Sequence, residues 1–295
     1  MKRISLLVLL MMFLSGCTQT ENLPNTQEPT LTQRSTSIPT ATLQPALQPI
    51  ASNTANPSLV PALSKDEATQ RVAELFETNN GCNLPCFWGI VPGQTNLADA
   101  KTILDELASI DYGPHRNESW AYDYFFDVGK PNTVGVHVTL YTDKDIVDFV
   151  GVTDFDSPSY HLPEFLSRNG APDQILVRTW KNSPSNTDQV PFLIYMYYKK
   201  SGMLVAYGMG TGRIENDSIK GCIERSPSLQ MWGIEKPQRI EEAMQLMGWF
   251  DANLISISDA TAGKLNVEKF LEQFSRSNSE TCFITSRSLW PEPDR

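Results

Sequence analysis

The sequence predicts an α+β fold made of two units, each a helical segment followed by three strands in a mainly antiparallel sheet, with a helical segment at the C-terminus. Two observations carry this prediction. Apolar residues recur at helical spacing before each set of strands, and within each set they alternate with polar residues at a period of two. Short turns join the strands of a set, which favours antiparallel pairing. The first unit is expected to span residues 64–156 and the second 157–290.

The first unit is expected to open with two helices. Ser64 and Glu67 have the spacing of a capping box ahead of an amphipathic segment. A second helix is expected after Thr95 or Asn96, either of which can cap it. The alternating segments that follow predict strands over Trp120–Val128, Val134–Tyr141 and Ile146–Thr153.

The second unit begins with a short helix over His161–Asn169, ended by Gly170 with Pro172 beyond it. Its strands are expected over Gln174–Trp180, Pro191–Tyr198 and Met203–Met209. The run Gly208–Gly212 is interpreted as a strand end with turn glycines, because it lacks the Lys-Ser/Thr ending of a phosphate loop. The C-terminal helices are expected over Pro237–Met247 and Asn266–Phe274.

A short internal echo links the two halves of the chain. Trp88-Gly89-Ile90 and Trp232-Gly233-Ile234 each lead into a predicted helix. The echo is either a trace of a repeat or a chance similarity between two helix entries, and the sequence does not separate these two explanations.

The N-terminus has the organisation of an export signal. Lys2 and Arg3 give a basic start, and an apolar run follows over Ile4–Leu14. A helix of these eleven residues rises only about 16 Å, roughly half of a bilayer's hydrocarbon thickness, so the run is too short for a stable span. It ends in Leu14-Ser15-Gly16-Cys17, which resembles the lipobox of bacterial lipoproteins.

The resemblance to a lipobox implies that residues 1–16 are removed and that Cys17 carries the lipid that tethers the protein to a membrane. The alternative is an ordinary signal peptide followed by a chance cysteine. Thr18 is not the aspartate that commonly retains lipoproteins at the inner membrane. In a host with two membranes, the protein is therefore expected on the extracytoplasmic side at the outer membrane.

Residues 17–63 are expected to form a disordered tether. From Thr18 to Leu63, 29 of 46 residues are Thr, Ser, Asn, Gln or Pro, and none is aromatic. Such a segment buries too little apolar surface to offset the entropy lost on ordering. Its length suits a domain held away from a membrane surface.

The charge of the chain argues against nucleic-acid binding. Removal of Lys2 and Arg3 with the signal leaves 22 basic and 34 acidic residues, a net charge of −12. A surface of this sign repels phosphate backbones, and the sequence has no cluster of Lys and Arg that offsets it locally.

Four cysteines remain after Cys17 is assigned to the lipid. An even number in an exported chain indicates two disulfides, and four cysteines allow three pairings. The favoured pairing is Cys82 with Cys86 and Cys222 with Cys282, because one pair is adjacent and the other brackets the C-terminal segment.

The Cys82-x-x-x-Cys86 spacing also occurs in thiol-redox and copper-binding loops, because two close thiolates can exchange a disulfide or bind a soft metal. One of the histidines His115, His137 and His161 would then supply a further ligand. The favoured interpretation is a structural clamp, since redox folds with such loops have parallel strands and this chain predicts hairpins.

No other pattern predicts catalysis, a metal or a cofactor. The three histidines lack metal-ligand spacing, and no Gly-x-Ser-x-Gly sequence occurs. His137 lies in an alternating strand and is expected to face solvent. The acidic residues Asp154, Asp156 and Glu164 are interpreted as part of a solvated loop.

Two tyrosines are the candidate binding surface. Tyr195 and Tyr197 share one face of a predicted strand, and the opposite face is expected to pack on helices. If no second helix covers them, they form an exposed aromatic surface for an envelope protein or a glycan. The alternative is that a second helix packs over them.

The run Ile90-Val91-Pro92-Gly93-Gln94-Thr95, followed by a helix and three strands, resembles the start of the small outer-membrane-assembly lipoproteins of the SmpA/OmlA type. It also resembles the tandem β-lactamase-inhibitor protein fold. The motif with the helix and strands that follow it covers about 65 residues of the chain. The second half of the chain lacks the Gly-x-Thr of the motif. The resemblance implies a non-enzymatic binding or assembly module of the cell envelope. The alternative function is thiol redox or copper binding at Cys82 and Cys86.

Overall fold

The computed structural model describes residues 63–107, 121–129, 135–153, 156–183, 187–223, 227–234, 240–246, 253–276 and 281–293. All of them belong to one compact unit, Leu59–Arg295. The export signal, Cys17 and the tether predicted over 17–63 lie outside the described residues, apart from Leu63. Within the described ranges, no helix is both long and apolar enough to cross a membrane.

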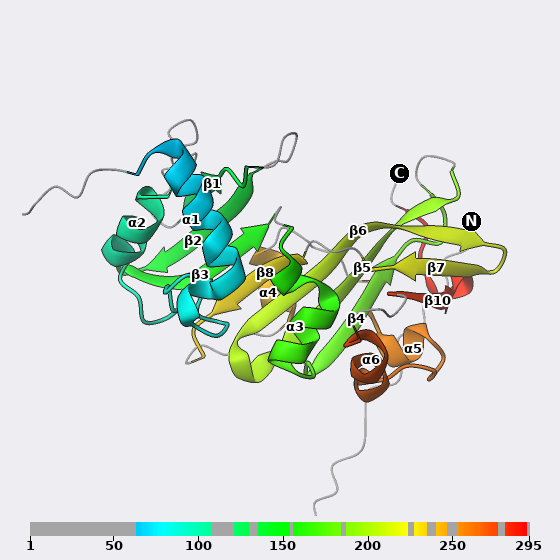
Figure 1. Ribbon diagram of the computed structural model, residues 1–295. Helices are drawn as coiled ribbons and strands as arrows, with labels where there is room; N and C mark the ends of the chain where they lie inside the picture. The colour runs from blue at the N-terminus through cyan, green and yellow to red at the C-terminus, as the bar shows by residue number, and fades with distance from the viewer. Residues whose placement is uncertain are drawn as a thin grey trace, which may run out of the picture. The chain divides into compact units, whose positions relative to one another are not determined.

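The centre of the described fold is a ten-stranded sheet in which all strand pairs are antiparallel (Figure 1). Its main order is β1-β2-β3-β8-β6-β5-β4-β9, while β7 pairs with β6 and β10 pairs with β7. The strands are β1 (Ala121–Phe126), β2 (Val136–Asp143), β3 (Ile146–Thr153), β4 (Gln174–Thr179), β5 (Gln189–Tyr198), β6 (Met203–Glu215), β7 (Ser218–Cys222), β8 (Pro227–Trp232), β9 (Ile255–Ser256) and β10 (Cys282–Ser286).

Helices pack on both faces of this sheet. The helices α1, α2, α3, α5 and α6 contribute to a large apolar cluster on one face, and α4 contributes to a smaller cluster on the other. Figure 1 shows α1, α2 and α3 in front of the strands and α4 behind β8. The helices are α1 (Lys65–Thr78), α2 (Leu97–Asp105), α3 (Leu162–Asn169), α4 (Ile240–Leu246), α5 (Ile257–Ala260) and α6 (Val267–Phe274).

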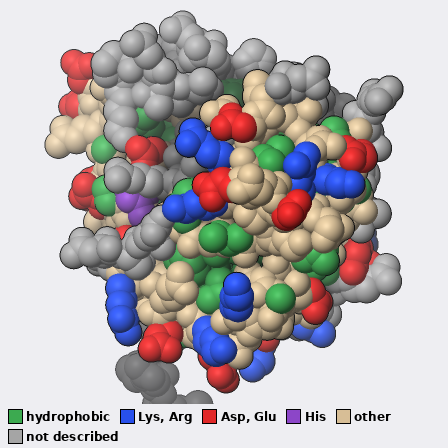
Figure 2. Space-filling model, turned by 90° about the vertical axis from the view of Figure 1, so that its right-hand side faces the viewer, with side chains coloured by type: hydrophobic (Ala, Val, Ile, Leu, Met, Phe, Trp, Pro, Cys, Tyr) green, Lys and Arg blue, Asp and Glu red, His purple; other side chains and the backbone are tan. Residues whose placement is uncertain are grey.

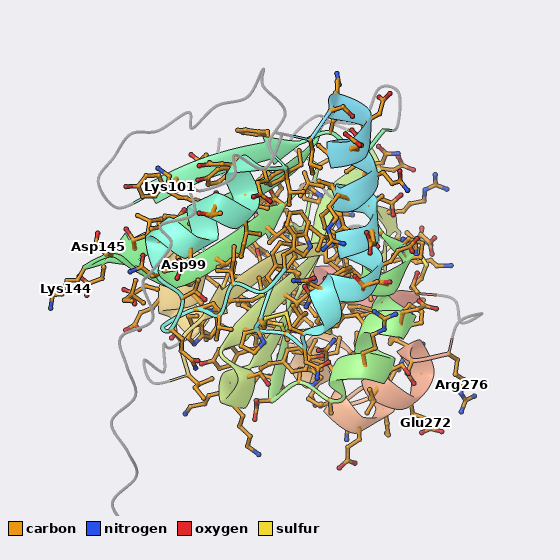
Figure 3. The ribbon with its side chains drawn as sticks, turned by 60° about the vertical axis from the view of Figure 1, so that its left-hand side comes forward. Asp99, Lys101, Lys144, Asp145, Glu272 and Arg276 are labelled. Atoms are coloured by element: carbon orange, nitrogen blue, oxygen red, sulfur yellow. A yellow bond between two sulfur atoms is a disulfide. The ribbon has the colours of Figure 1, made fainter. Side chains whose placement is uncertain are left out.

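Local sequence signals explain how the first helices begin. The Ser64 hydroxyl accepts from the backbone N–H of Glu67, and the Glu67 carboxylate accepts from the backbone N–H of Ser64, which completes the predicted capping box. The Asn96 side chain caps α2, and the Leu97 N–H donates to the Asp145 carbonyl at 2.8 Å. The β2–β3 turn therefore lies against the start of α2, beside Asp99 (Figure 3).

The larger cluster follows the alternation of the strands. In β2, Val136, Val138 and Leu140 are fully buried, while the intervening residues face the opposite side of the sheet. Ala100 and Leu104 on α2 pack into the same cluster. Continuous burial of the apolar stripe is what holds the helices on this face.

The mixed α+β class predicted from the sequence is confirmed. The three predicted strands of each half form antiparallel meanders, β1-β2-β3 and β4-β5-β6, and β8 pairs with both β3 and β6. Both meanders therefore lie in one sheet. The sequence analysis missed β8 because its alternating run over 228–231 is only four residues long. The region after β8 holds α4, α5 and α6 but also the unpredicted strands β9 and β10.

The interpretation of Gly208–Gly212 as a strand end is wrong, because β6 continues to Glu215. Gly208 lies opposite a bulge between Phe192 and Ile194 and has a φ of +112°, where a Cβ would meet the Phe192 carbonyl at 2.4 Å. A Cβ on Gly212 would lie 3.2 Å from the Phe192 ring. These glycines make room for a bulge and a buried ring inside the strand rather than ending it.

The two Trp-Gly-Ile copies have different environments. Trp88 lies in a loop with a φ of 55° and packs in the larger cluster, whereas Trp232 ends β8 and packs in the smaller one. The second copy packs against the residues that follow the first one, since a Cβ on Gly233 would lie 3.0 Å from the Gly93 Cα. The two tryptophans are therefore not structurally equivalent.

Candidate functional site

The loop around Cys82 and Cys86 is the most tightly organised irregular segment among the described residues. Asn79, at the end of α1, adopts the left-handed region with a φ of 48°. Its side-chain Nδ2 donates to the carbonyl oxygens of Cys82 at 2.8 Å and Cys86 at 2.7 Å. Its Oδ1 accepts from the Trp88 N–H at 2.9 Å. One amide side chain therefore fixes both ends of the loop and the start of the next turn.

Aromatic rings support this corner from the interior. Phe87 and Trp88 are fully buried and stack with their centroids 4.6 Å apart. Phe76 of α1 meets the Trp88 ring edge-on at 4.9 Å. The corner is thus anchored to the main core by large apolar side chains, which favours a fixed loop geometry.

Both predicted disulfides are present. Cys82 and Cys86 are joined with their Cα atoms 5.8 Å apart, and Cys222 and Cys282 with theirs 4.0 Å apart. Cys222 and Cys282 lie directly opposite each other in the β7–β10 pair. The first bridge closes a corner, and the second fixes the register of a strand pair.

A pocket of about 580 Å³ opens beside the corner. It lies between the end of α1, the Cys82–Leu84 segment, the turn Pro158–Tyr160 and α3. Most of its lining is polar, and it includes Cys82 but not Cys86. Its volume falls within the range of small-molecule sites in proteins.

The described histidines have carboxylate partners of their own. His161 Nε2 lies 2.8 Å from Asp156 Oδ1, and His137 Nε2 lies 2.9 Å from Asp123 Oδ1. Across the described ranges, no group of three His, Cys, Asp or Glu side chains is placed to hold a metal ion. Asp156 and Glu164 belong to no such group, and His115 and Asp154 lie outside the described residues.

The Asp123–His137 pair forms a small polar cluster with Thr139 on the face of the sheet opposite α1 and α2. The Thr139 hydroxyl donates to Asp123 Oδ1 at 2.7 Å, and the His137 ring stacks on Phe125 with centroids 4.3 Å apart. His137 is therefore half-buried rather than free in solvent, with its side chain 27% exposed. The Thr139 hydroxyl also lies 3.2 Å from His137 Nε2, so the three side chains form one hydrogen-bonded group that links β1 and β2.

Sequence reasoning missed this cluster because strand register creates it. Asp123 of β1 lies opposite Thr139 of β2, and Phe125 lies opposite His137. The residues are 14 and 16 positions apart in the chain, so no spacing rule connects them. The alternation of β1 and β2 was the available signal, since it places Asp123, His137 and Thr139 on the same face once the register is known.

The expected exposed surface at Tyr195 and Tyr197 is wrong. Tyr195 is fully buried and Tyr197 is 5% exposed. Both belong to the smaller cluster with Ala243 and Met244 of α4, so a second helix covers them, which was the alternative explanation. Burial raises the pKa of the Tyr197 phenol, and Asp173 and the acidic residues of α4 add to this effect.

Surface charges of both signs are interspersed over the face that carries the β6–β7 hairpin, β10 and the α5–α6 region (Figure 2). Figure 3 shows the same mixture at α6, where Glu272 pairs at 3.6 Å with Arg276 just after the end of the helix. Exposed pairs of this kind contribute little to stability.

Comparison of the chain with protein-family models, with characterised proteins and with solved structures finds no match.

Proposed function

We propose that this chain is an exported lipoprotein, anchored to a bacterial membrane through Cys17 and acting as a non-enzymatic binding or assembly module of the cell envelope. The observation that best supports export is the pair of disulfides, Cys82–Cys86 and Cys222–Cys282. Disulfides persist in oxidising compartments and are rare in reducing ones. They agree with the basic start, the apolar run and the Leu14–Cys17 lipobox in the sequence.

The architecture supports a binding role on two counts. The meanders β1-β2-β3 and β6-β5-β4 flank β8, an arrangement that fits two helix-plus-three-strand units sharing one sheet. This arrangement is the one implied by the resemblance to assembly lipoproteins and inhibitor proteins. The Asp123–His137–Thr139 cluster and the pocket beside Cys82 are organised polar features that can contact a partner or a ligand.

The test of anchoring is a Cys17→Ser variant expressed in a bacterial host. The variant is expected to move from the membrane fraction to the soluble extracytoplasmic fraction and to lose incorporation of labelled fatty acid, because a lipid chain supplies the attachment. A Thr18→Ser variant is the matched control and should stay in the membrane fraction. Membrane retention of the Cys17→Ser variant would contradict the proposal.

The competing function is thiol redox or copper binding at Cys82 and Cys86. One observation favours it, namely that Cys82 lines a pocket and is reachable from solvent. A redox or copper site requires an exposed sulfur with a lowered thiol pKa. Titration of the reduced protein with Cu(I), together with the alkylation rate of its thiols near neutral pH, separates the two functions.

A further inference from the structure

The pocket beside the disulfide corner contains polar groups that the fold does not use. The side chains of Arg168, Asn83, Ser159 and Ser201 line it and make no hydrogen bond or ion pair within the described part of the chain. By contrast, the Asn79 amide is fully engaged with the corner, and Asn169 Nδ2 donates to the Phe165 carbonyl. The pocket therefore presents one cation, one carboxylate at Glu77, one free amide and two hydroxyls to whatever enters it.

The walls of the pocket are fixed from several directions. The disulfide and Asn79 hold Cys82 and its neighbours, and the Tyr207 hydroxyl donates to the Tyr160 carbonyl at 2.6 Å. Of the aromatic residues in the lining, Tyr160 is 5% exposed and Phe165 is 1% exposed. Arg168 and Asn169 lie in the last turn of α3. A site with fixed walls loses little conformational entropy when a ligand binds.

The charge of this pocket differs from that of the protein as a whole. Lys199 and Lys200 directly precede the lining residue Ser201 in the chain, and like Arg168 they have no ion pair in the described residues. The acids nearby are Glu77 in the lining, Asp173, whose carboxylate accepts from the Lys199 backbone N–H, and Glu164, which lies one helical turn before Arg168 on α3. Three cations against three acids give a locally balanced charge on a chain with a net charge of −10. Arg168 is the cation of the lining, so an anionic group on a ligand is expected to pair with its guanidinium.

The lining also matches a hydroxylated ligand. Amides, hydroxyls and an aromatic ring are the groups that donate to, accept from and pack against a sugar, and the cavity of about 580 Å³ accommodates a monosaccharide. Burial raises the pKa of the Tyr160 phenol, an effect that Arg168 partly offsets, so the phenol stays neutral near pH 7. The phenol thus adds no negative charge beside the guanidinium.

We propose that this pocket binds a sugar that carries a carboxylate, with the Arg168 guanidinium paired to the carboxylate and Asn83, Ser159 and Ser201 bonded to the sugar hydroxyls. Arginine suits this role because its planar fork pairs with a carboxylate through two parallel hydrogen bonds. The site adds a ligand class to the proposed binding role and does not depend on the anchor at Cys17.

The test uses the full chain in detergent micelles and two matched pairs of sugars, glucuronate with glucose and N-acetylmuramate with N-acetylglucosamine, followed by isothermal titration calorimetry. Each pair differs in the carboxylate-bearing substituent. At least one acid is expected to bind about ten-fold more tightly than its neutral partner, and the Arg168→Gln variant is expected to remove that difference. Arg213, an exposed arginine that does not line the pocket, supplies the matched control Arg213→Gln, which should leave binding unchanged.

Each outcome decides the proposal. Circular dichroism of the Arg168→Gln variant checks that this exposed substitution leaves the fold intact. Absence of binding by both acids overturns the proposal, as does equal binding of each acid and its neutral partner or an acid affinity that Arg168→Gln does not change. Since fractionation tests the anchor and titration tests the pocket, failure of one is distinguishable from failure of the other.

Discussion

At the scale of the residue, Asn79 shows how one side chain can determine a local structure. Its left-handed φ of 48° ends α1, and its amide forms three hydrogen bonds with the Cys82, Cys86 and Trp88 backbone. Asparagine tolerates this backbone region better than most residues, so the position meets a conformational and a hydrogen-bonding requirement together. The geometry of the pocket wall depends on both.

Replacement of Asn79 by alanine is expected to destabilise the protein by about 2 kcal/mol more than replacement of Asn80. Both residues have a φ near 50°, so the backbone cost of alanine is shared by the two variants. The difference is that Asn79 makes three hydrogen bonds at 2.7–2.9 Å, whereas Asn80 is exposed and its side chain makes one long contact with Arg71 at 3.4 Å. Urea unfolding of the two variants measures the difference, and equal midpoints would show that the amide network contributes nothing.

Single residues also show the limit of prediction from sequence. The disulfide pairing was predictable because cysteine count and spacing constrain it. The burial of Tyr195 was not, because it depends on a helix that starts 45 residues later and packs on that face. Strand register brings the neighbours of His137 together, and packing of α3 brings those of Arg168 together. Neither set of neighbours can be predicted from the residue types of one segment.

At the scale of the element, the β6–β7 pair is shaped around one ring. The Phe192 side chain is 1% exposed and meets Phe283 edge-on at 5.1 Å. A Cβ on Gly221 of β7 would lie 2.2 Å from this ring, and a Cβ on Gly212 of β6 would lie 3.2 Å from it. At these glycines the Phe192 ring passes over the strand backbone. From the sequence alone, such glycines are easily mistaken for turn residues.

Gly221→Ala is expected to destabilise the protein by about 3 kcal/mol, because the new methyl group forces the buried Phe192 ring out of its position. Gly212→Ala is the matched control and should cost about 1 kcal/mol or less, since its neighbours need to shift by only a few tenths of an ångström. Chemical unfolding of both variants gives the comparison. A Gly221→Ala/Phe192→Leu double variant should recover part of the loss, and strict additivity would contradict this explanation.

At the scale of the whole molecule, the sheet depends on contacts between distant parts of the chain. β8 joins the β1-β2-β3 meander to β6, although it follows β3 by more than 70 residues. β10 returns to pair with β7, and the Arg287 N–H then donates to the Asp217 carbonyl at 2.9 Å. The alternation of apolar and polar residues predicted the strands of the two meanders. It did not predict how the meanders join, because a strand that pairs at long range carries no local signal of its partner.

The two disulfides are expected to contribute unequally to stability because they close chain segments of different length. Cys222 and Cys282 are 60 residues apart, whereas Cys82 and Cys86 are 4 apart. The chain-entropy argument gives a loss of about 4 kcal/mol for the Cys222→Ser/Cys282→Ser variant and about 2 kcal/mol for Cys82→Ser/Cys86→Ser. The long loop spans α4, α5 and α6, and its bridge joins the ends of the paired strands β7 and β10.

Guanidinium unfolding of the two double variants, alongside the unmodified chain, measures both losses. Loss of the Cys82–Cys86 bridge should weaken ligand binding at the pocket, because Cys82 lines that cavity while Cys222 and Cys282 do not. The Cys222→Ser/Cys282→Ser variant is therefore expected to lose much stability and to bind the sugar unchanged. The Cys82→Ser/Cys86→Ser variant is expected to lose little stability and to bind the sugar more weakly. A larger stability loss at the short bridge would mean that the corner carries more of the folding free energy than its loop length provides.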